Sequence, residues 1–505
     1  MFKKTVLISS AVLLTAACSL TFAANSKNIA AKKDTVAKQK LIKESALTKT
    51  DKNKKTITSK IGDNPGANII SNAFNYESSL PVSINPRTLM LSVTLPLAAL
   101  GDQNGPSVNF ALGYQQHNNY QRYTIPGFSG SMPLGIALPY IDTQSITPYA
   151  GTIHLPNGGS YQLETPETGR MQLHQYSLND TSVYSVPNGE TAPDGQTYYY
   201  DLSTLNGEVY YFDSWGTLVC INKQVLDVNK QPVNHYISFK SSYDQENKQS
   251  TLNTITTSGG LSISFTQDNY GTNIILPGNR QISVSYQGVT YSIYNYPDTA
   301  NLAKFQLTKI EFNPNDLNEI EKITYPTGLT RDFGYSSYTN TNGQLISYVS
   351  SDITTLNGKQ IVTKYAPLGS NTFLGDCSGS ADDCLMNESH AYNYQTQITS
   401  GGVATVNTYN HLHLLTQQTM QTNTEIPSAL QDTQYVYSGE DGDNFDSMSY
   451  ADIAARYPNY QKPATTTQTT YATPSQLRTL YKNTAYDAKY NQLLEKAANN
   501  IVGGK

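Results

Sequence analysis

The stretch "YYFDSWGTLVCI", from Tyr210 to Ile221, alternates aromatic and aliphatic side chains, breaks at Asp213 and Gly216, and resumes with Leu218. Such alternation places apolar side chains on one face of a β strand. An aspartate bonds the backbone of its own turn, and a glycine accepts a positive φ at little cost. The stretch therefore predicts two antiparallel strands joined by a tight turn.

Similar units recur along the chain. The pattern Tyr-x-Phe-Asp-x-x-Gly-x-Leu compares with "YDAKYNQLL" from Tyr486, "YNHLHLL" from Tyr409 and "FGYSSYTNTNGQL" from Phe333. A second pattern appears as "IHLPNGGSY" at Ile153, "IILPGNRQ" at Ile274 and "ITYPTGLT" at Ile323. The predicted repeat-motif residues are Tyr210, Phe212, Asp213, Gly216, Leu218, Tyr486, Asp487, Asn491 and Leu493. Repeated hairpins that bury one another's faces predict an extended antiparallel sheet, a β-solenoid or a partial shell.

The rest of the chain favours the same all-β fold. Tyrosine reaches 38 residues beside 34 glycines, a mixture typical of strands and turns. Runs at 89–100 and 107–114 surround "GDQNGP" and predict a hairpin. The other strand candidates are 151–155, 160–164, 197–201, 208–212, 217–221, 235–239, 260–265, 273–276, 281–286 and 289–294. Only "YADIAARY" (Tyr450 to Tyr457) and "LLEKAANN" (Leu493 to Asn500) suggest short helices.

The beginning of the chain predicts export. Lys3 and Lys4 precede an apolar run from Val6 to Leu14, the pattern of a signal peptide over residues 1–24. Cys18 after "TAA" leaves a lipoprotein open as the alternative. We therefore expect a secreted or cell-surface protein, and no later stretch is apolar enough for a transmembrane helix.

Four regions follow from composition. After the signal peptide, residues 25–61 form a Lys-rich segment predicted to be a disordered tether, then an N-terminal β region covers 62–203 and a repeat-like β region covers 204–505. The tether is either a spacer or an attachment to anionic surface polymers or lipids. Beyond residue 60, 21 basic and 36 acidic residues leave a net charge of about −15. This acidic body argues against nucleic acid as a partner.

Cysteine usage agrees with export. Cys377 and Cys384 bracket "SGSADD", and we predict that they form a disulfide closing a short loop, worth roughly 2.5 kcal/mol by the chain-entropy argument. A metal pair is the less favoured reading because no second ligand pair lies nearby. Cys220 lies mid-strand and is expected to be a buried small hydrophobe.

Several phrases resemble the Rhs/YD-repeat family, and the amino-terminal portion resembles that of insecticidal toxin-complex and Rhs proteins. They are "SINPRTLMLSVTLPLAALGDQNGPSVNFALGY", "NTYNHLHLLTQQT", "YPNYQKPATTTQTTY" and "TAYDAKYNQLLEK", spread over roughly residues 80 to 495. The resemblance implies β strands that spiral into a shell, which in full-length members encloses a carboxy-terminal toxin. The "DPxG"-type boundary and the toxin end of the family do not appear before Lys505, so encapsulation and self-cleavage are not carried over. A shortened member, a partial shell and one part of a split locus all stay open.

No stretch predicts a catalytic, cofactor or metal site. "GFSGS" matches the letters of a nucleophile elbow around Ser129, but its flanks lack the strand-to-helix transition. His411 and His413, expected on one strand face, lack a positioned carboxylate, and "GEDGDNFD" (Gly439 to Asp446) misses the EF-hand spacing. Paired carboxylates for glycoside cleavage stay open.

The function expected from these observations is that of an exported, non-catalytic structural or scaffold protein of toxin delivery or surface interaction. The alternatives are a carbohydrate-binding adhesin, in which tyrosines such as those of Thr204 to Asp213 stack on sugars, and a secreted hydrolase. Expected partners are other toxin-complex or surface components, or glycans, and no cofactor is expected.

Overall fold

The computed structural model describes the strands and their connections over most of the chain beyond residue 81. The described residues are 82–101, 105–116, 122–124, 126, 134–143, 149–155, 160–164, 169–171, 173, 181–268, 271–301, 303–339, 345–369, 393–410, 412–437, 448, 453, 456–457, 460, 462–473, 476–486 and 493–503. The predicted signal peptide, Cys18 and the Lys-rich segment lie outside them. Residues 61–505 form one compact unit.

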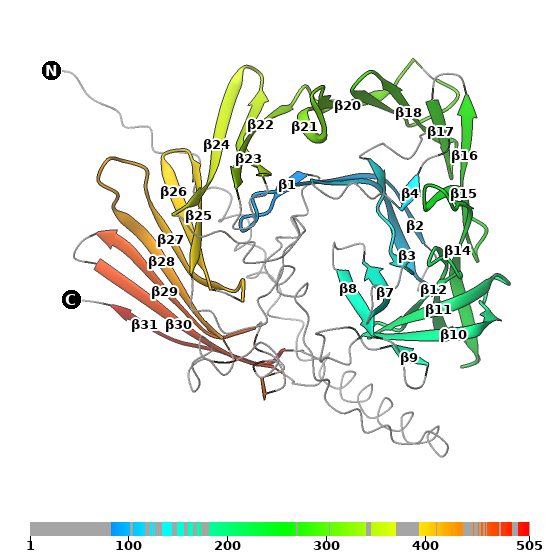
Figure 1. The fold of residues 1–505 in the computed structure, drawn as a ribbon, viewed down its shortest axis with the longest axis horizontal. Coiled ribbons are helices and arrows are strands. Elements are labelled where there is room, and N and C mark those ends of the chain that lie inside the picture. The colour runs from blue at the N-terminus through cyan, green and yellow to red at the C-terminus, as the bar shows by residue number, and fades with distance from the viewer. Residues whose placement is uncertain are drawn as a thin grey trace. The chain divides into compact units, whose positions relative to one another are not determined.

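One antiparallel sheet contains 22 strands that pair in the order of the sequence, as the colours from cyan to red show in Figure 1. Its strands are β10 (Thr181–Thr191), β11 (Thr197–Thr204), β12 (Glu208–Phe212), β13 (Leu218–Leu226), β14 (Pro232–Asp244), β15 (Gln249–Thr257), β16 (Ser262–Asp268), β17 (Gly271–Leu276), β18 (Arg280–Gln287), β19 (Thr290–Tyr296), β20 (Gln306–Asn313), β21 (Asp316–Thr324), β22 (Thr330–Thr339), β23 (Leu345–Leu356), β24 (Lys359–Leu368), β25 (Tyr394–Ser400), β26 (Val403–Tyr409), β27 (Leu415–Thr422), β28 (Ala429–Tyr437), β29 (Pro463–Thr473), β30 (Gln476–Tyr486) and β31 (Leu493–Gly503). The all-β, extended antiparallel fold predicted from the sequence is confirmed.

Alternation along the strands buries one face of the sheet. In β17, Thr272, Ile274 and Leu276 are buried while the residues between them are half-buried. In β14, Ile237 and Phe239 are fully buried. Side chains two residues apart share a face of a strand, so this pattern requires a second layer on the buried side.

The N-terminal strands provide that second layer, here called the N-terminal layer (residues 82–173). β1 (Val82–Ile84), β2 (Leu91–Gly101), β3 (Ser107–Gln115) and β5 (Gly135–Ile136) form one small sheet, and β6 (Tyr140–Asp142), β7 (Tyr149–His154) and β8 (Ser160–Glu164) form another. β2 and β3 pair antiparallel, as the predicted hairpin requires. Their buried side chains join those of the long sheet in one hydrophobic core, for example where Phe110 packs edge-on against Phe265 at 5.6 Å.

Two further strands of the N-terminal layer pair with the long sheet directly. β4 (Tyr123–Thr124) runs parallel to β15, and β9 (Arg170–Met171) extends the antiparallel pairing at β10. The strands β10 and β11 belong to the long sheet, and the division into regions 62–203 and 204–505 stays a prediction.

One turn geometry recurs between strands. The N–H of the first residue of the turn donates to the carbonyl of the residue four positions later. The carbonyl of the first residue accepts the N–H of the residue three positions later, and that residue has a positive φ. This is the tight hairpin turn closed by a left-handed residue. Its first residues are Ala192, Asp213, Asp227, Thr257, Tyr325 and Asn410, and its left-handed residues are Gly195, Gly216, Lys230, Gly260, Gly328 and His413.

The structure contains helical residues at one of the two predicted short helices and a strand at the other. Ile453 and Arg456 are helical, and the N–H of Tyr457 bonds the carbonyl of Ile453 at 2.8 Å. The helix predicted from Leu493 to Asn500 is wrong, because these residues belong to β31, which pairs with β30 along its length. The helix propensity of Leu, Glu, Lys and Ala is outweighed there by the backbone pairing that a neighbouring strand offers.

Candidate functional site

The turn after β12 has a complete set of local hydrogen bonds. The Oδ1 atom of Asp213 accepts the N–H of Trp215 at 2.9 Å and the N–H of Thr217 at 2.8 Å. Gly216 has φ 78°, and Phe212 lies opposite Leu218 across the strand pair. Burial raises the pKa of the Asp213 carboxyl, while the two backbone donors oppose this shift.

The same turn receives the N-terminal layer. Ile141 donates its N–H to the carbonyl of Gly216 at 2.8 Å, and Leu218 donates its N–H to the hydroxyl of Tyr123 at 2.7 Å. A Cβ atom at position 216 would lie 1.9 Å from the carbonyl oxygen of Ile141. Glycine is therefore required here by close approach as well as by its φ.

Arg122 fastens β4 beside this turn. Its Nη1 atom donates to the carbonyl of Lys248 at 2.9 Å, and its Nη2 atom donates to the carbonyl of Trp215. The guanidinium lies over the ring of Tyr243 at 4.6 Å, and the Trp215 ring stacks on the same tyrosine at 4.8 Å. The arginine thus joins the N-terminal layer to β14, β15 and the turn, using hydrogen bonds and a cation–π contact.

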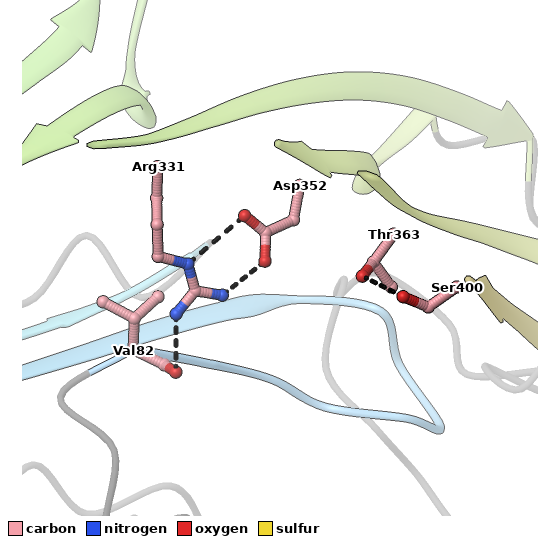
Figure 2. A network of polar contacts seen from close by, with 5 residues as sticks. All are labelled: Val82, Arg331, Asp352, Thr363 and Ser400. Atoms are coloured by element: carbon pink, nitrogen blue, oxygen red, sulfur yellow. Dashed lines mark hydrogen bonds and ion pairs between the residues drawn. The ribbon is translucent and has the colours of Figure 1, made fainter. Parts of the chain in front are cut away.

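A buried ion pair fastens the first strand of the layer, as Figure 2 shows. Arg331 on β22 bonds Asp352 on β23 through Nε at 3.2 Å and Nη2 at 2.5 Å. Its third nitrogen, Nη1, donates to the carbonyl of Val82 on β1 at 3.1 Å. The two charged side chains are 16% and 7% exposed, so this contact, here called the β1 clamp, is largely desolvated. Nearby, Thr363 on β24 bonds Ser400 on β25 at 3.1 Å.

The connection from β1 to β2 is held by backbone contacts to the long sheet. Val349 donates its N–H to the carbonyl of Leu89 at 2.9 Å, and the hydroxyl of Thr396 donates to the carbonyl of Pro86 at 2.6 Å. Gln116 adds a bond from Nε2 to the carbonyl of Ser347 at 3.1 Å. These contacts place the layer against β23 and β25.

The buried carboxylate of Glu319, on β21, lies beside the contact of β3 with β21. Asn313 donates to the Oε2 atom of Glu319 at 2.9 Å, and the hydroxyl of Ser347 donates to its other oxygen. Tyr114 donates to the carbonyl of Asn318, and Tyr335 donates to that of Ile320 at 2.8 Å. Burial raises the pKa of both phenols, with the nearby carboxylate adding to the shift, so both remain neutral donors.

The other predicted motif residues are only partly described. Tyr486 and Leu493 lie opposite each other across β30 and β31, while Asp487 and Asn491 lie outside the described residues. Asn410, in the related phrase "YNHLHLL", accepts the N–H groups of Leu412 and Leu414 at 3.0 Å each.

Several other predicted positions lie outside the described residues, namely Cys377, Cys384, Ser129, His411 and 439–446. His413 is described, and its expected place on a strand face is wrong. It is the left-handed residue of the Asn410 turn, fully buried, with Nδ1 2.8 Å from the hydroxyl of Tyr394.

The remaining sequence candidates are structural. Cys220 is fully buried on β13, as expected, and burial raises the pKa of its thiol. Within Thr204–Asp213, Tyr210 packs against the main core and Tyr211 packs edge-on against Tyr198 at 4.7 Å. These rings therefore serve packing in the sheet rather than an open face.

Neither a metal cluster nor a membrane-spanning helix is present in the described residues. They contain no group of three or more His, Cys, Asp and Glu side chains placed to hold a metal ion. In the same part of the chain, no helix has the length and apolar character needed to cross a bilayer.

The β1 clamp and the Arg122 contacts were missed by reasoning from the sequence. Val82 and Arg331 are far apart in the chain, and neither stands in a recognisable motif. A basic residue in the strand-like stretch "LTRDFGYSSY" was the one available signal, because a charge on a packed strand needs a partner.

No protein-family model and no curated protein matches the chain. Among solved structures, it is similar to a chain of the Photorhabdus luminescens Tc holotoxin pore, with 9% identity, a TM-score of 0.25, and coverage of 83% of this chain and 26% of that one. A chain described as TcdB2-TccC3-TEV has 11% identity, a TM-score of 0.17, and coverage of 81% and 23%. A porin-like protein from Bacteroides uniformis has 12% identity, a TM-score of 0.17, and coverage of 56% and 95%.

This chain therefore spans about a quarter of the toxin-complex chains it matches. Toxin-complex chains are among its structural neighbours. Similarity at these scores assigns no family to the chain.

Proposed function

We propose that this protein is an exported, non-catalytic scaffold of the Rhs and toxin-complex type, whose long sheet holds other components at or outside the cell surface. The observation that carries the proposal is the fastening of the N-terminal layer across the sheet. Polar contacts join the layer to strands from β13 to β25, including the bonds of Leu218, Lys248, Asn318, Arg331 and Thr396. These contacts hold the N-terminal layer and the long sheet together as one framework.

The use of buried polar groups supports the same proposal. Glu319, Asp352 and Arg331 are engaged in contacts between strands or layers. Buried charges at catalytic sites are arranged to act on a bound substrate, whereas these are satisfied by the protein's own backbone and side chains. Their arrangement suits a rigid support.

Export is part of the proposal and rests on the sequence of residues 1–24. The chain is secreted or held at the surface, with the Lys-rich segment between the signal peptide and the folded unit. The partners proposed are further toxin-complex or surface components, because the sequence resembles proteins of that kind.

The experiment is affinity isolation of the tagged full chain from the cell that produces it, after mild chemical crosslinking, combined with protease treatment of intact cells. A scaffold is expected outside the cytoplasm and in stoichiometric complex with at least one other exported protein. An Arg331→Met chain is the matched variant, since loosening the β1 clamp should reduce recovery of the partner while export continues. A wild-type protein that stays in the cytoplasm, or is exported without a protein partner, contradicts the proposal.

A hydrolase is tested in parallel. Purified wild-type and Ser129→Ala proteins are compared on ester and glycoside substrates. Turnover by the wild type that the substitution abolishes would replace the scaffold proposal with an enzymatic one.

A further inference from the structure

Two tyrosines and a phenylalanine gather at the end of β19. The Tyr294 and Tyr296 rings are nearly parallel, with centroids 6.3 Å apart and an interplanar angle of 15°. Phe305 contacts both, at 5.3 Å from Tyr294 and 5.9 Å from Tyr296. The phenylalanine is 47% exposed, and both tyrosines are half-buried, so part of this aromatic cluster is open to solvent.

The cluster lies on the face of the sheet opposite to the core. Tyr291 and Ile293 are buried against the N-terminal layer, and alternation along β19 directs Tyr294 and Tyr296 to the other face. Tyr294 lies opposite Ser283 on β18 and opposite Leu307 on β20. Tyr296 lies opposite Gln281. Leu307 can pack beside Tyr294 on the β20 side, whereas on the β18 side the small or polar Ser283 and Gln281 do not cover the rings as an aliphatic or aromatic neighbour would.

A row of hydrogen-bonding side chains adjoins the rings. Gln281 donates from Nε2 to the Oδ1 atom of Asn273 at 2.9 Å and lies 3.0 Å from the hydroxyl of Ser283. Ser283 in turn donates to the same oxygen of Asn273 at 2.5 Å. The row is thus ordered beside the two tyrosines before any ligand arrives, which lowers the entropy cost of binding.

The tyrosines packed in the interior of the described chain lack this combination. Tyr123, Tyr394, Tyr409, Tyr437 and Tyr460 are almost fully buried. Tyr198, which lies in a small hydrophobic cluster with Cys220, is 8% exposed and donates its hydroxyl to Glu190 at 2.8 Å. The cluster at Tyr294 therefore differs from the packed tyrosines in being both exposed and bordered by amides.

We propose that Tyr294, Tyr296 and Phe305, together with Gln281, Ser283 and Asn273, form a binding site for a neutral oligosaccharide chain. A pyranose ring has an apolar C–H face that packs on an aromatic ring and hydroxyls that bond amide and hydroxyl groups at its edge. The two tyrosines would contact successive sugar rings, and Gln281 and Asn273 would bond their hydroxyls. This site goes beyond the scaffold function and depends on a different face of the sheet.

The test uses the purified full chain on an array of neutral and anionic glycans, followed by isothermal titration with the neutral oligosaccharide that gives the strongest signal. Tyr294→Ala and Tyr296→Ala are each expected to weaken binding by about tenfold or more, equivalent to about 1.4 kcal/mol. Tyr294→Phe, which keeps the ring, should retain most of the affinity. Gln281→Ala should weaken binding by a few-fold, because one hydrogen bond to a sugar hydroxyl is lost.

Tyr184→Ala is the matched control, because Tyr184 is 37% exposed on β10, away from the cluster. Thermal melting of every variant checks that the fold is kept. Absence of neutral-glycan binding by the wild type, equal binding by the Tyr294→Ala protein, or binding only of anionic glycans that salt abolishes would each overturn the proposal. The glycan measurements use the purified chain without a protein partner. A failed glycan-binding test can therefore be told apart from a failed test of the scaffold function.

Discussion

Asp213 and Asn410 hold two turns of the long sheet with the same set of hydrogen bonds. In each turn the side-chain Oδ1 atom accepts the N–H groups two and four residues on, and the residue three on has a positive φ. The turn of Asp213 contacts the N-terminal layer through Gly216, whereas that of Asn410 packs His413 against Tyr394. One local geometry thus serves two different tertiary contacts.

Gly216→Ala should destabilise the protein strongly, by about 3 kcal/mol or more. The positive φ alone disfavours an alanine by roughly 1–2 kcal/mol, and the new methyl group would overlap the carbonyl of Ile141. Urea unfolding monitored by fluorescence of Trp215, the one tryptophan of the sequence, measures the loss at this turn.

Gly260→Ala is the matched control for that substitution. Gly260 occupies the same position of an equivalent turn, with φ 86°, and a Cβ atom there would meet nothing within 4 Å. The Gly260→Ala protein should lose only the stability that the positive φ costs an alanine, roughly 1–2 kcal/mol. Equal losses for the two variants would show that the contact with Ile141 is unimportant.

Asp213→Ala should cost about 1–2 kcal/mol, because the N–H groups of Trp215 and Thr217 lose their acceptor. Asp213→Asn should be nearly neutral, since an asparagine already provides both bonds in the Asn410 turn. The free energy of unfolding and the emission wavelength of Trp215 are the measurements. A loss for the asparagine variant as large as for the alanine variant would mean that charge, rather than hydrogen bonding, stabilises this turn.

Arg331→Met should destabilise the protein by about 3–5 kcal/mol, because it leaves the Asp352 carboxylate buried and unpaired. Replacing both residues, Arg331→Met with Asp352→Leu, should recover much of this loss, because no uncompensated charge then remains. Backbone amides of β1 should exchange hydrogen faster in the single variant, because the Val82 carbonyl loses the hydrogen bond donated by Arg331.

Lys322→Met provides the comparison for the β1 clamp. Lys322 pairs with Asp332 at 3.0 Å, but both side chains are more than a third exposed. Removing it should cost about 1 kcal/mol or less. If both arginine and lysine substitutions cost the same, burial does not determine the strength of these pairs.

Asp201→Asn should raise the melting temperature at neutral pH and change it little near pH 4. Burial, with the Glu190 carboxylate adding, raises the pKa of Asp201 from 3.8 to about 6 in the folded protein. Between these values the folded state holds a proton that the unfolded state has lost, so stability falls as pH rises from about 4 to about 6. The gain at pH 7 should be about 1–2 °C, because water reaches the half-buried carboxyl.

Melting curves of wild type and variant at several pH values between about 4 and 7 test this prediction. The difference between the two melting temperatures should grow with pH and level off above the folded pKa of Asp201. A constant difference would show that Asp201 titrates at its ordinary value.

Local hairpins could be predicted from the sequence because each carries its own signal. The predicted strand of Glu208–Phe212 has the bounds of β12, and that of Ser160–Glu164 has those of β8. Alternation sets the buried face, and Asp or Gly marks the turn, so neighbouring residues suffice. Leu493–Asn500 was mispredicted because the pairing of β31 with β30 is an interaction that local propensity does not report.

The candidate sites, unlike the hairpins, could not be predicted from neighbouring residues in the sequence. Arg331 meets Val82 only after the N-terminal layer packs on the sheet, and Tyr294 becomes distinct from the buried tyrosines only when one face of β19 is covered. Tyr291 and Tyr294 look alike in the sequence, and the layer that buries the first leaves the second on the other face.

The sequence by itself determined the strands, the turns and the all-β character of this protein, because these depend on side-chain alternation and on backbone preferences over a few residues. Only the tertiary structure decided which charges are buried in pairs and which aromatic rings meet solvent. Those outcomes depend on contacts between residues hundreds of positions apart, and the free energy of such contacts arises when water is excluded between packed layers.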